Sequence, residues 1–99
     1  MAYSNRGISY AQLQKYPQAL ADFNKAIQLN PNDFEPYNSR GTTYYILKNY
    51  NSAIQDFSKV IQLDPNNADA YHSRGLCYKK LGQVTKAQAD LAKAKQLGY

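Results

Sequence analysis

The chain contains one cysteine, one histidine and no tryptophan among its 99 residues. One cysteine excludes a disulfide framework, and one cysteine with one histidine cannot supply the usual ligand set of a zinc site. No apolar run approaches the ~20 residues that a membrane-spanning helix needs. The first residues hold neither a basic nor an apolar stretch, so we expect no export signal in this sequence. The single free thiol slightly favours a reducing compartment such as the cytoplasm.

Apolar residues are only moderately abundant. They make up 43% of the chain, and the mean hydropathy is −0.69. A chain of this length has room for one modest core, and such a composition suits a thin, regular stack better than a thick globule. We therefore expect a single domain over residues 1–99.

Acidic residues are scarce in the last third of the chain. Twelve basic and seven acidic residues give a net charge of +5. The charges before residue 70 cancel, whereas residues 70–99 hold six basic residues and one acidic residue, Asp90. Such an end can attract acidic partners or nucleic acid, although a lysine-rich last helix is more often just a solvated face.

A sequence pattern repeats every 34 residues. The motif Tyr-x-x-Arg-Gly starts at Tyr3, Tyr37 and Tyr71. The motif Ala-x-x-Asp-Phe starts at Ala19 and Ala53, with a looser copy at Ala87. This period predicts three repeats, over residues 1–33, 34–67 and 68–99.

Each repeat contains two segments with the apolar spacing of an α-helix. The expected helices span residues 3–14 and 17–29, 34–47 and 51–63, and 68–81 and 84–97. Prolines at positions 31 and 65 end the second helix of their repeats, because the residue before proline avoids the helical region. A glycine inside each first helix costs roughly 0.5 to 1 kcal/mol relative to alanine. We expect the three glycines, Gly7, Gly41 and Gly75, to contact the small residues Ala19, Ala53 and Ala87 of the partner helix.

The combination of motifs and period resembles the tetratricopeptide repeat over almost the whole chain. The resemblance implies an all-α fold, a right-handed superhelical solenoid of three helix-turn-helix repeats with six helices. It also implies a non-catalytic scaffold that binds proteins. The family most often has tryptophan where this chain has the first tyrosine of each repeat, and leucine where it has Arg6, Arg40 and Arg74. Because an arginine in a packing position needs a carboxylate, we expect bidentate pairs with Asp22, Asp56 and Asp90.

No residue pattern predicts catalysis. His72 has no cysteine or carboxylate at a metal-binding offset, and Cys77 stands where the other repeats have Ser9 and Thr43, which indicates a packing role. The three aspartates recur once per repeat, whereas one active site needs one copy. No glycine-rich phosphate loop is present. We therefore expect no enzyme activity, metal, cofactor or small-molecule substrate.

The ten tyrosines raise the question of nucleic-acid binding, since aromatic side chains within a basic groove stack on bases. Eight of them occupy fixed repeat positions, which indicates packing between helices: Tyr3, Tyr10, Tyr16, Tyr37, Tyr44, Tyr50, Tyr71 and Tyr78. Only Tyr45 and Tyr99 lie outside this pattern. Nucleic-acid binding is therefore the less favoured alternative, and a steep loss of affinity with salt would identify it.

The first helix of the middle repeat has one face left over after packing. At ~100° per residue, one arc holds Tyr37, Gly41 and Tyr44, and an adjoining arc holds Arg40, Thr43 and Leu47. We expect both arcs to face the paired helix and the previous repeat. The remaining arc holds Glu35, Asn38, Thr42, Tyr45 and Ile46. In tetratricopeptide arrays this face lines a concave groove that takes an extended peptide or a partner helix. The resemblance adds, from the other repeats, Ser4, Ile8, Ala11, Gln12, Asp69, His72, Leu76, Lys79 and Lys80.

The groove residues predict the chemistry of a ligand. The apolar members Ile8, Tyr45, Ile46 and Leu76 form a cluster of the kind that marks interaction sites, although scattered surface hydrophobes are ordinary. Lys79, Lys80 and His72 favour an acidic group, so we expect a mixed apolar and acidic peptide anchored near Tyr45. Some family members clamp the C-terminal carboxylate of a chaperone with Lys, Asn and Arg. The matching positions here are Ser4, Ile8, Ser39, Asp69 and Ser73, which disfavours that ligand.

A competing interpretation is a structural unit that self-associates. Met1 truncates the first expected helix, which suggests excision from a longer repeat protein. At the other end, Gln88 and Lys95 stand where earlier repeats have isoleucine or leucine for contact with the next repeat, as in Ile54 and Ile61. We therefore expect the array to end with the third repeat.

Overall fold

The computed structural model describes residues 2–99, which form six α-helices and no strand. The helices are α1 (Ala2–Gln12), α2 (Tyr16–Leu29), α3 (Phe34–Ile46), α4 (Tyr50–Leu63), α5 (Ala68–Lys80) and α6 (Val84–Gln96). Met1, on which the expectation of a truncated first helix depends, lies outside the described residues. The all-α solenoid predicted from the repeat is thus confirmed.

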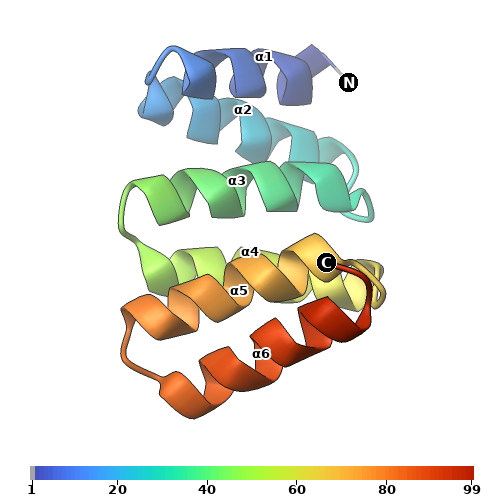
Figure 1. Ribbon diagram of the computed structural model, residues 1–99. Coiled ribbons are helices and arrows are strands. Elements are labelled where there is room, and N and C mark those ends of the chain that lie inside the picture. The colour runs from blue at the N-terminus through green and yellow to red at the C-terminus, as the bar shows by residue number, and fades with distance from the viewer. Residues whose placement is uncertain (1) are drawn as a thin grey trace.

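The helices stack in chain order into a layered array of 36 × 24 × 18 Å (Figure 1). Each helix packs on the next, and α3 also contacts both α1 and α5. The turns within the helix pairs lie along one edge of the array, which we call the intra-repeat edge, and the turns between pairs lie along the opposite, inter-repeat edge (Figure 1). The first helices of the three pairs therefore line up as neighbours.

The three turns of the intra-repeat edge share one backbone geometry. Each has a left-handed residue at the same repeat position: Gln14 (φ 61°), Lys48 (φ 63°) and Gly82 (φ 74°). In each turn the following amide bonds back to the carbonyl oxygen of a tyrosine, as Lys15 N–H does to Tyr10 at 2.8 Å. This is the hydrogen-bond pattern of a Schellman helix end. Leu47 lies in such a turn and is 45% exposed, so its predicted packing against neighbouring helices is wrong.

Side-chain caps start the helices that follow the inter-repeat turns. The Asp33 carboxylate accepts from the Glu35 amide at 3.1 Å, and the Asn67 side chain accepts from the Ala70 amide at 3.0 Å. Such N-caps satisfy amides that have no partner within the helix. They fix where α3 and α5 begin, and hence the register of the residues on their open face.

Aromatic rings of the second helices form the centre of the core. Phe23 and Phe57 occupy equivalent positions in α2 and α4, and each is 1% exposed. Cys77 is fully buried against Ala53 and Phe57, and burial raises the pKa of its thiol to about 11. The thiol is therefore protonated at neutral pH and acts as a packing group.

The helical glycines leave room for these rings. A Cβ atom on Gly41 would lie 3.0 Å from the Phe57 ring, and one on Gly7 would lie 2.7 Å from the Phe23 ring. A Cβ on Gly7 would also lie 3.2 Å from the carbonyl oxygen of Ala19, and one on Gly75 would lie 3.0 Å from the side chain of Leu91. The predicted approach of Gly7 to Ala19 is confirmed at that oxygen, whereas the atoms nearest to a Cβ on Gly41 or Gly75 belong to larger side chains than Ala53 and Ala87.

Each arginine of the repeat motif forms a bidentate pair with the aspartate sixteen residues later, as the spacing predicts. In the middle pair, Arg40 Nε and Nη2 donate to the two carboxylate oxygens of Asp56 at 2.9 and 2.7 Å. The same two bonds join Arg6 to Asp22 and Arg74 to Asp90, at 2.7 to 2.8 Å. Tyrosines one helical turn before and after each arginine place their rings 5.6 to 6.0 Å from its guanidinium, which adds cation–π attraction.

The outer surface of α6 is polar at the positions that join one repeat to the next. Ile27 and Ile61 pack between helix pairs, whereas Lys95 at the equivalent position is exposed, as is Gln88. These two side chains keep the face of α6 compatible with water.

Candidate functional site

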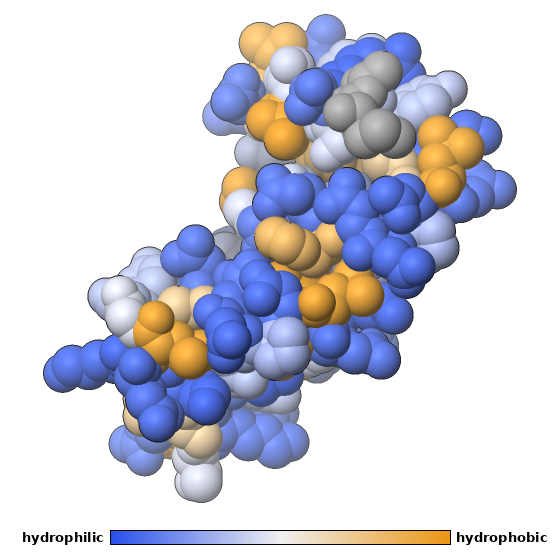
Figure 2. All heavy atoms as spheres, turned by 90° about the vertical axis from the view of Figure 1, so that its right-hand side faces the viewer, coloured by the Kyte–Doolittle hydropathy of each residue, from blue (hydrophilic) through white to orange (hydrophobic). Residues whose placement is uncertain are grey.

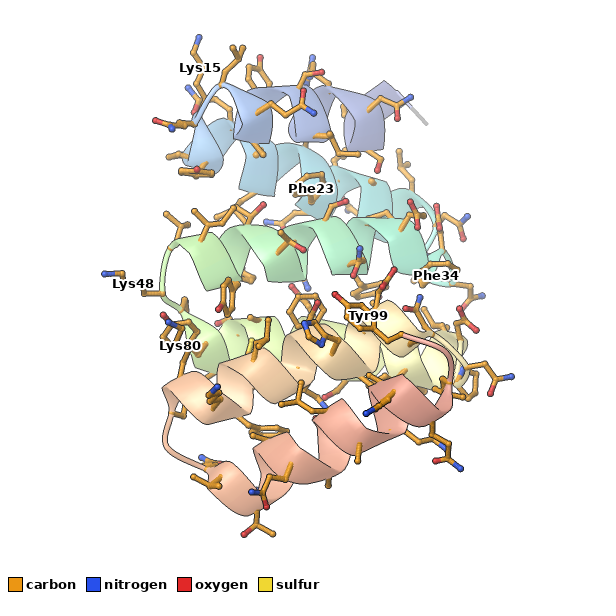
Figure 3. The ribbon with its side chains drawn as sticks, viewed as in Figure 1. Lys15, Phe23, Phe34, Lys48, Lys80 and Tyr99 are labelled. Carbon is orange, nitrogen blue, oxygen red and sulfur yellow. The ribbon has the colours of Figure 1, made fainter. Side chains whose placement is uncertain are left out.

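Two hollows lie side by side on the face formed by α1, α3 and α5, which we call the groove face. The α1–α3 hollow, of about 390 Å³, is lined by Ile8, Ala11, Gln12, Phe23, Asn38, Ser39, Thr42, Thr43 and Ile46. The α3–α5 hollow, of about 280 Å³, is lined by Thr42, Tyr45, Phe57, His72, Ser73, Leu76 and Tyr99. Thr42 lines both, so the hollows adjoin across the middle of α3. Phe23, which lines the α1–α3 hollow, is labelled in Figure 3.

Two hydroxyl groups that line the hollows are bonded within their own helix. The Thr42 hydroxyl donates to the Asn38 carbonyl oxygen at 3.0 Å, and the Thr43 hydroxyl donates to the Ser39 carbonyl oxygen at 2.9 Å. Such bonds to the preceding helical turn need no outside partner. Among the described residues, no buried side-chain polar atom lacks a hydrogen bond. The surface that both hollows present to a ligand is mainly apolar.

Aromatic contacts shape the α3–α5 hollow. Tyr45 packs edge-on against Tyr50, with ring centroids 5.5 Å apart and an interplanar angle of 67°. His72 stacks on Tyr99, with centroids 4.0 Å apart and an angle of 13°. Tyr99 reaches this face because Gly98 takes a left-handed φ of 102° at the end of α6, which turns the chain back toward α5 (Figure 3).

Most of the predicted groove residues line one of the two hollows. Those that do are Ile8, Ala11, Gln12, Asn38, Thr42, Tyr45, Ile46, His72 and Leu76. Ser4 is only 7% exposed, so its predicted place on the open face is wrong. Glu35 and Asp69 are exposed in the first turns of α3 and α5, and Lys79 and Lys80 are exposed in the last turn of α5. These four charged residues lie along the helices beyond the hollows.

Several lining residues are not among the predicted ones. Phe23, Phe57 and Thr43 form the floor of the hollows, and the helical spacing assigns them to packing. Packing and lining are compatible, because the open side of a core residue can face a hollow. Tyr99 is the larger omission. Its signal in the sequence is the preceding Gly98, a residue suited to the left-handed turn that ends a helix.

The arginines and aspartates of the repeat motif bond to each other inside the fold. Hydrogen bonds from Arg6 hold the pKa of Asp22 below its ordinary value, against the opposing effect of burial. Hydrogen bonds to Asp56 and Asp90 raise the pKa values of Arg40 and Arg74.

Within residues 2–99, no group of three or more His, Cys, Asp or Glu side chains is placed to hold a metal ion. Across the same residues, no helix is both long and apolar enough to cross a membrane.

The inter-repeat edge, unlike the groove face, is not the place of the two adjoining apolar hollows. Figure 2 shows this edge, where apolar residues form small separate groups among hydrophilic ones. Scattered surface hydrophobes of this kind are ordinary on folded domains. The groove face is therefore the better candidate for a binding site.

Comparison with known families accounts for nearly every residue of the chain. Models of the tetratricopeptide repeat match residues 1–33, 23–55 and 68–97, and a model of the TPR repeat matches residues 41–82. No curated protein matches the chain.

Solved structures share the fold over almost the whole chain. The first TPR of Spaghetti (RPAP3), bound to the HSP90 peptide SRMEEVD, is 23% identical with a TM-score of 0.95 and covers 98% of this chain and 77% of its own. The Arabidopsis OM64 TPR domain is 26% identical with a TM-score of 0.94, covering 98% of this chain and 80% of its own. MamA is 27% identical with a TM-score of 0.95, covering 97% of this chain and 56% of its own. The chain belongs to the tetratricopeptide-repeat family, whose domains serve generally as protein-interaction modules.

Proposed function

We propose that the groove face binds an extended peptide or a partner helix and that it does so without catalysis. The observation that carries this proposal is the pair of apolar hollows that adjoin at Thr42. Binding sites are typically concave and mostly apolar, with a few polar groups that fix orientation. A trough that crosses three helices suits a ligand with side chains along its length.

The exposed apolar side chains support the same site. Ile8 is 37% exposed and Ile46 is 50% exposed, and both line the α1–α3 hollow. A ligand that covers them gains roughly 25 cal/mol per Å² of apolar surface removed from water. Tyr45 and Leu76 extend this surface into the α3–α5 hollow.

The charges around the hollows define the expected ligand more closely. Among residues 2–99, no lysine or arginine lines either hollow, so the hollows themselves favour apolar groups. Lys79 and Lys80 at the end of α5 favour an acidic residue there, while Glu35 and Asp69 at the other end disfavour one. The ligand we propose is therefore a mixed apolar and acidic segment, bound at roughly micromolar strength, about −8 kcal/mol.

The ligand of the Spaghetti domain is a weaker guide. That domain is bound to an HSP90 peptide ending in EEVD. In this chain the positions that correspond to the family's carboxylate clamp hold Ser4, Ile8, Ser39, Asp69 and Ser73. A terminal carboxylate would find no basic side chain at these five positions. We therefore propose an internal segment or one anchored by apolar side chains.

The test is a titration with a peptide selected from a random display library. Thr42→Lys places a long charged side chain between the two hollows, and Thr42 is exposed, so the fold should tolerate it. Gln55→Lys makes the same change of charge on the exposed face of α4 and serves as the control. We expect Thr42→Lys to weaken binding at least tenfold and Gln55→Lys to leave it unchanged. Equal binding by both variants would show that the ligand does not use the hollows.

Tyr45→Ala tests the anchor within the site. A hot-spot tyrosine contributes on the order of 2 kcal/mol to binding. Because Tyr45 also packs against Tyr50, the free energy of unfolding of the variant is measured in parallel. Lys79→Ala should mainly change the salt dependence of binding. If Lys79→Ala abolishes binding while folded Tyr45→Ala binds as well as the parent, electrostatic attraction replaces the apolar anchor.

A further inference from the structure

Five of the nine lysines lie on the intra-repeat edge. Lys15 and Lys48 lie in its first two turns. Lys79 and Lys80 end α5, and Lys86 lies in the beginning of α6, so they flank the third turn. All five side chains are exposed, and no aspartate or glutamate lies in these turns. Figure 3 shows Lys15, Lys48 and Lys80 along one side of the array, one from each helix pair.

The other charges of the chain balance one another. Three arginines are paired with Asp22, Asp56 and Asp90. The four remaining carboxylates all belong to the inter-repeat turns or the helix starts beside them: Asp33, Glu35, Asp64 and Asp69. The four lysines elsewhere match them in number: Lys25, Lys59, Lys93 and Lys95. The five lysines of the intra-repeat edge therefore equal the net charge of +5.

Apolar side chains project from the same turns. Leu13 is 67% exposed, Leu47 is 45% exposed, and Val84 at the start of α6 is 58% exposed. Each lies within three residues of an edge lysine in the chain. The turns thus present exposed aliphatic side chains next to lysines at a row of helix ends. This combination suits a partner surface that is anionic on the outside and apolar beneath.

We propose that the intra-repeat edge binds the surface of an anionic lipid membrane. The lysines would lie at the level of the phosphates, and Leu13, Leu47 and Val84 would enter between the headgroups. Clusters of four to eight basic residues are the usual size for such binding. The edge lies at the ends of the helices and the hollows lie along their sides, so the two proposed sites share only Lys79 and Lys80 at the end of α5.

Other partners fit the edge less well. A nucleic acid would neutralise the lysines, but its phosphates would gain nothing from the exposed leucines. A peptide would need a concave seat along the edge, whereas the hollow at the third turn, lined by Gly82, Gln83, Val84, Thr85 and Lys86, extends to neither of the other two turns. A membrane is the one partner that uses both the charge and the apolar tips.

The test is co-sedimentation with vesicles made of equal parts phosphatidylserine and phosphatidylcholine. The edge variant combines Lys15→Gln, Lys48→Gln and Lys80→Gln. The control variant combines Lys25→Gln, Lys93→Gln and Lys95→Gln, which removes the same charge from other surfaces. Since each lysine near an anionic surface strengthens binding by about fivefold, the edge variant should lose on the order of 100-fold in partitioning. The partitioning of the control variant should fall much less. Neutral vesicles should bind neither variant.

A leucine variant separates the membrane from nucleic acid. Leu13→Ser with Leu47→Ser should weaken vesicle binding on the order of tenfold, and binding to duplex DNA should not change. Thermal melts verify that every variant is folded. The proposal is overturned if the parent does not sediment with the anionic vesicles, or if the edge and control variants lose equally. It is also overturned if the edge variant loses only binding to DNA, because nucleic acid would then be the partner.

Discussion

The first and middle helix pairs carry the same arginine–aspartate pair in different surroundings. In both, the guanidinium donates two hydrogen bonds of 2.7 to 2.9 Å to the carboxylate. The Arg6 side chain is 59% exposed, however, whereas the Arg40 side chain is 22% exposed. Arg40 also donates through Nη1 to Asn24 of the preceding helix pair at 2.8 Å. Arg74 likewise donates to Ser58 at 3.2 Å.

The two pairs of residues distinguish the interactions formed inside one repeat from those that the preceding repeat contributes. The sixteen-residue spacing fixes the bidentate geometry inside each pair of helices. Burial and the third hydrogen bond come from the helix pair before it. In a solenoid, stability is the sum of the intrinsic stability of each repeat and the interactions between neighbouring repeats. The arginine position contributes to both.

The largest expected effect is the loss of the middle carboxylate. Asp56→Asn leaves the partly buried Arg40 without its counter-charge and should destabilise the fold by about 2 to 3 kcal/mol, between the ranges for exposed and buried pairs. Asp22→Asn should cost clearly less, since water can solvate Arg6. Denaturant unfolding of both variants measures the difference. Equal losses would mean that the neighbouring helix pair adds nothing.

The next largest effect is expected from the hydrogen bond between helix pairs. Asn24→Ala removes the acceptor for Arg40 Nη1 and should lower the free energy of unfolding by about 1 kcal/mol. The matched change is Ala21→Ser, an exposed position of α2 that is not bonded to Arg40, and it should be nearly neutral. In the double variant with Asp56→Asn, the effect of Asn24→Ala should shrink, because the two acceptors share one guanidinium. Full additivity would argue against a linked network.

The intra-repeat turns give a smaller effect of opposite sign. Gln14 and Lys48 hold a left-handed conformation that Gly82 adopts in the third turn. Lys48→Gly relieves a strain of roughly 1 kcal/mol but increases the entropy of the unfolded chain, for a net gain of about 0.5 kcal/mol. Gln14→Gly should give a similar gain without a change of charge. A loss of stability in both variants would show that these turns are unstrained.

The smallest expected effect is on the acid side of the stability curve. The pKa of Asp22 is lower in the folded chain than in the unfolded chain, so Asp22 contributes stability above its unfolded pKa of ~3.9. That contribution is lost as the pH falls through the folded pKa. Asp22→Asn should therefore reduce the pH dependence of unfolding below about pH 4. An unchanged acid limb would show that the exposed pair with Arg6 is fully screened by water.

The sequence predicts the fold well because its signals are local and repeated three times. The expected helix over residues 34–47 is α3 (Phe34–Ile46), and the others agree to within a few residues. The prediction of packing residues fails just beyond the end of α3. Helical spacing assigns Leu47 to packing, but the left-handed residue after it ends the helix, so the spacing rule no longer applies.

The site is harder to predict than the fold, for a physical reason. Helical spacing identifies which side of α3 is open, and this brings Thr42, Tyr45 and Ile46 into the hollows. It does not give the reach of a side chain, so it misses the Phe57 ring beneath Gly41. Nor does it show that Gly98 turns Tyr99 onto His72, because that contact depends on one backbone dihedral. Whether these residues bind a ligand stays a prediction.

The most direct test of the proposed binding face is an NMR titration of the uniformly labelled chain with the display-selected peptide. Amide shifts report which surface the ligand covers, without any substitution that could disturb the fold. We predict that the largest shift changes fall on residues beside the hollows, such as Ile8, Thr42 and Leu76, with little change along the outer face of α6. Changes confined to the intra-repeat edge or to α6, with the hollow residues unmoved, would contradict it.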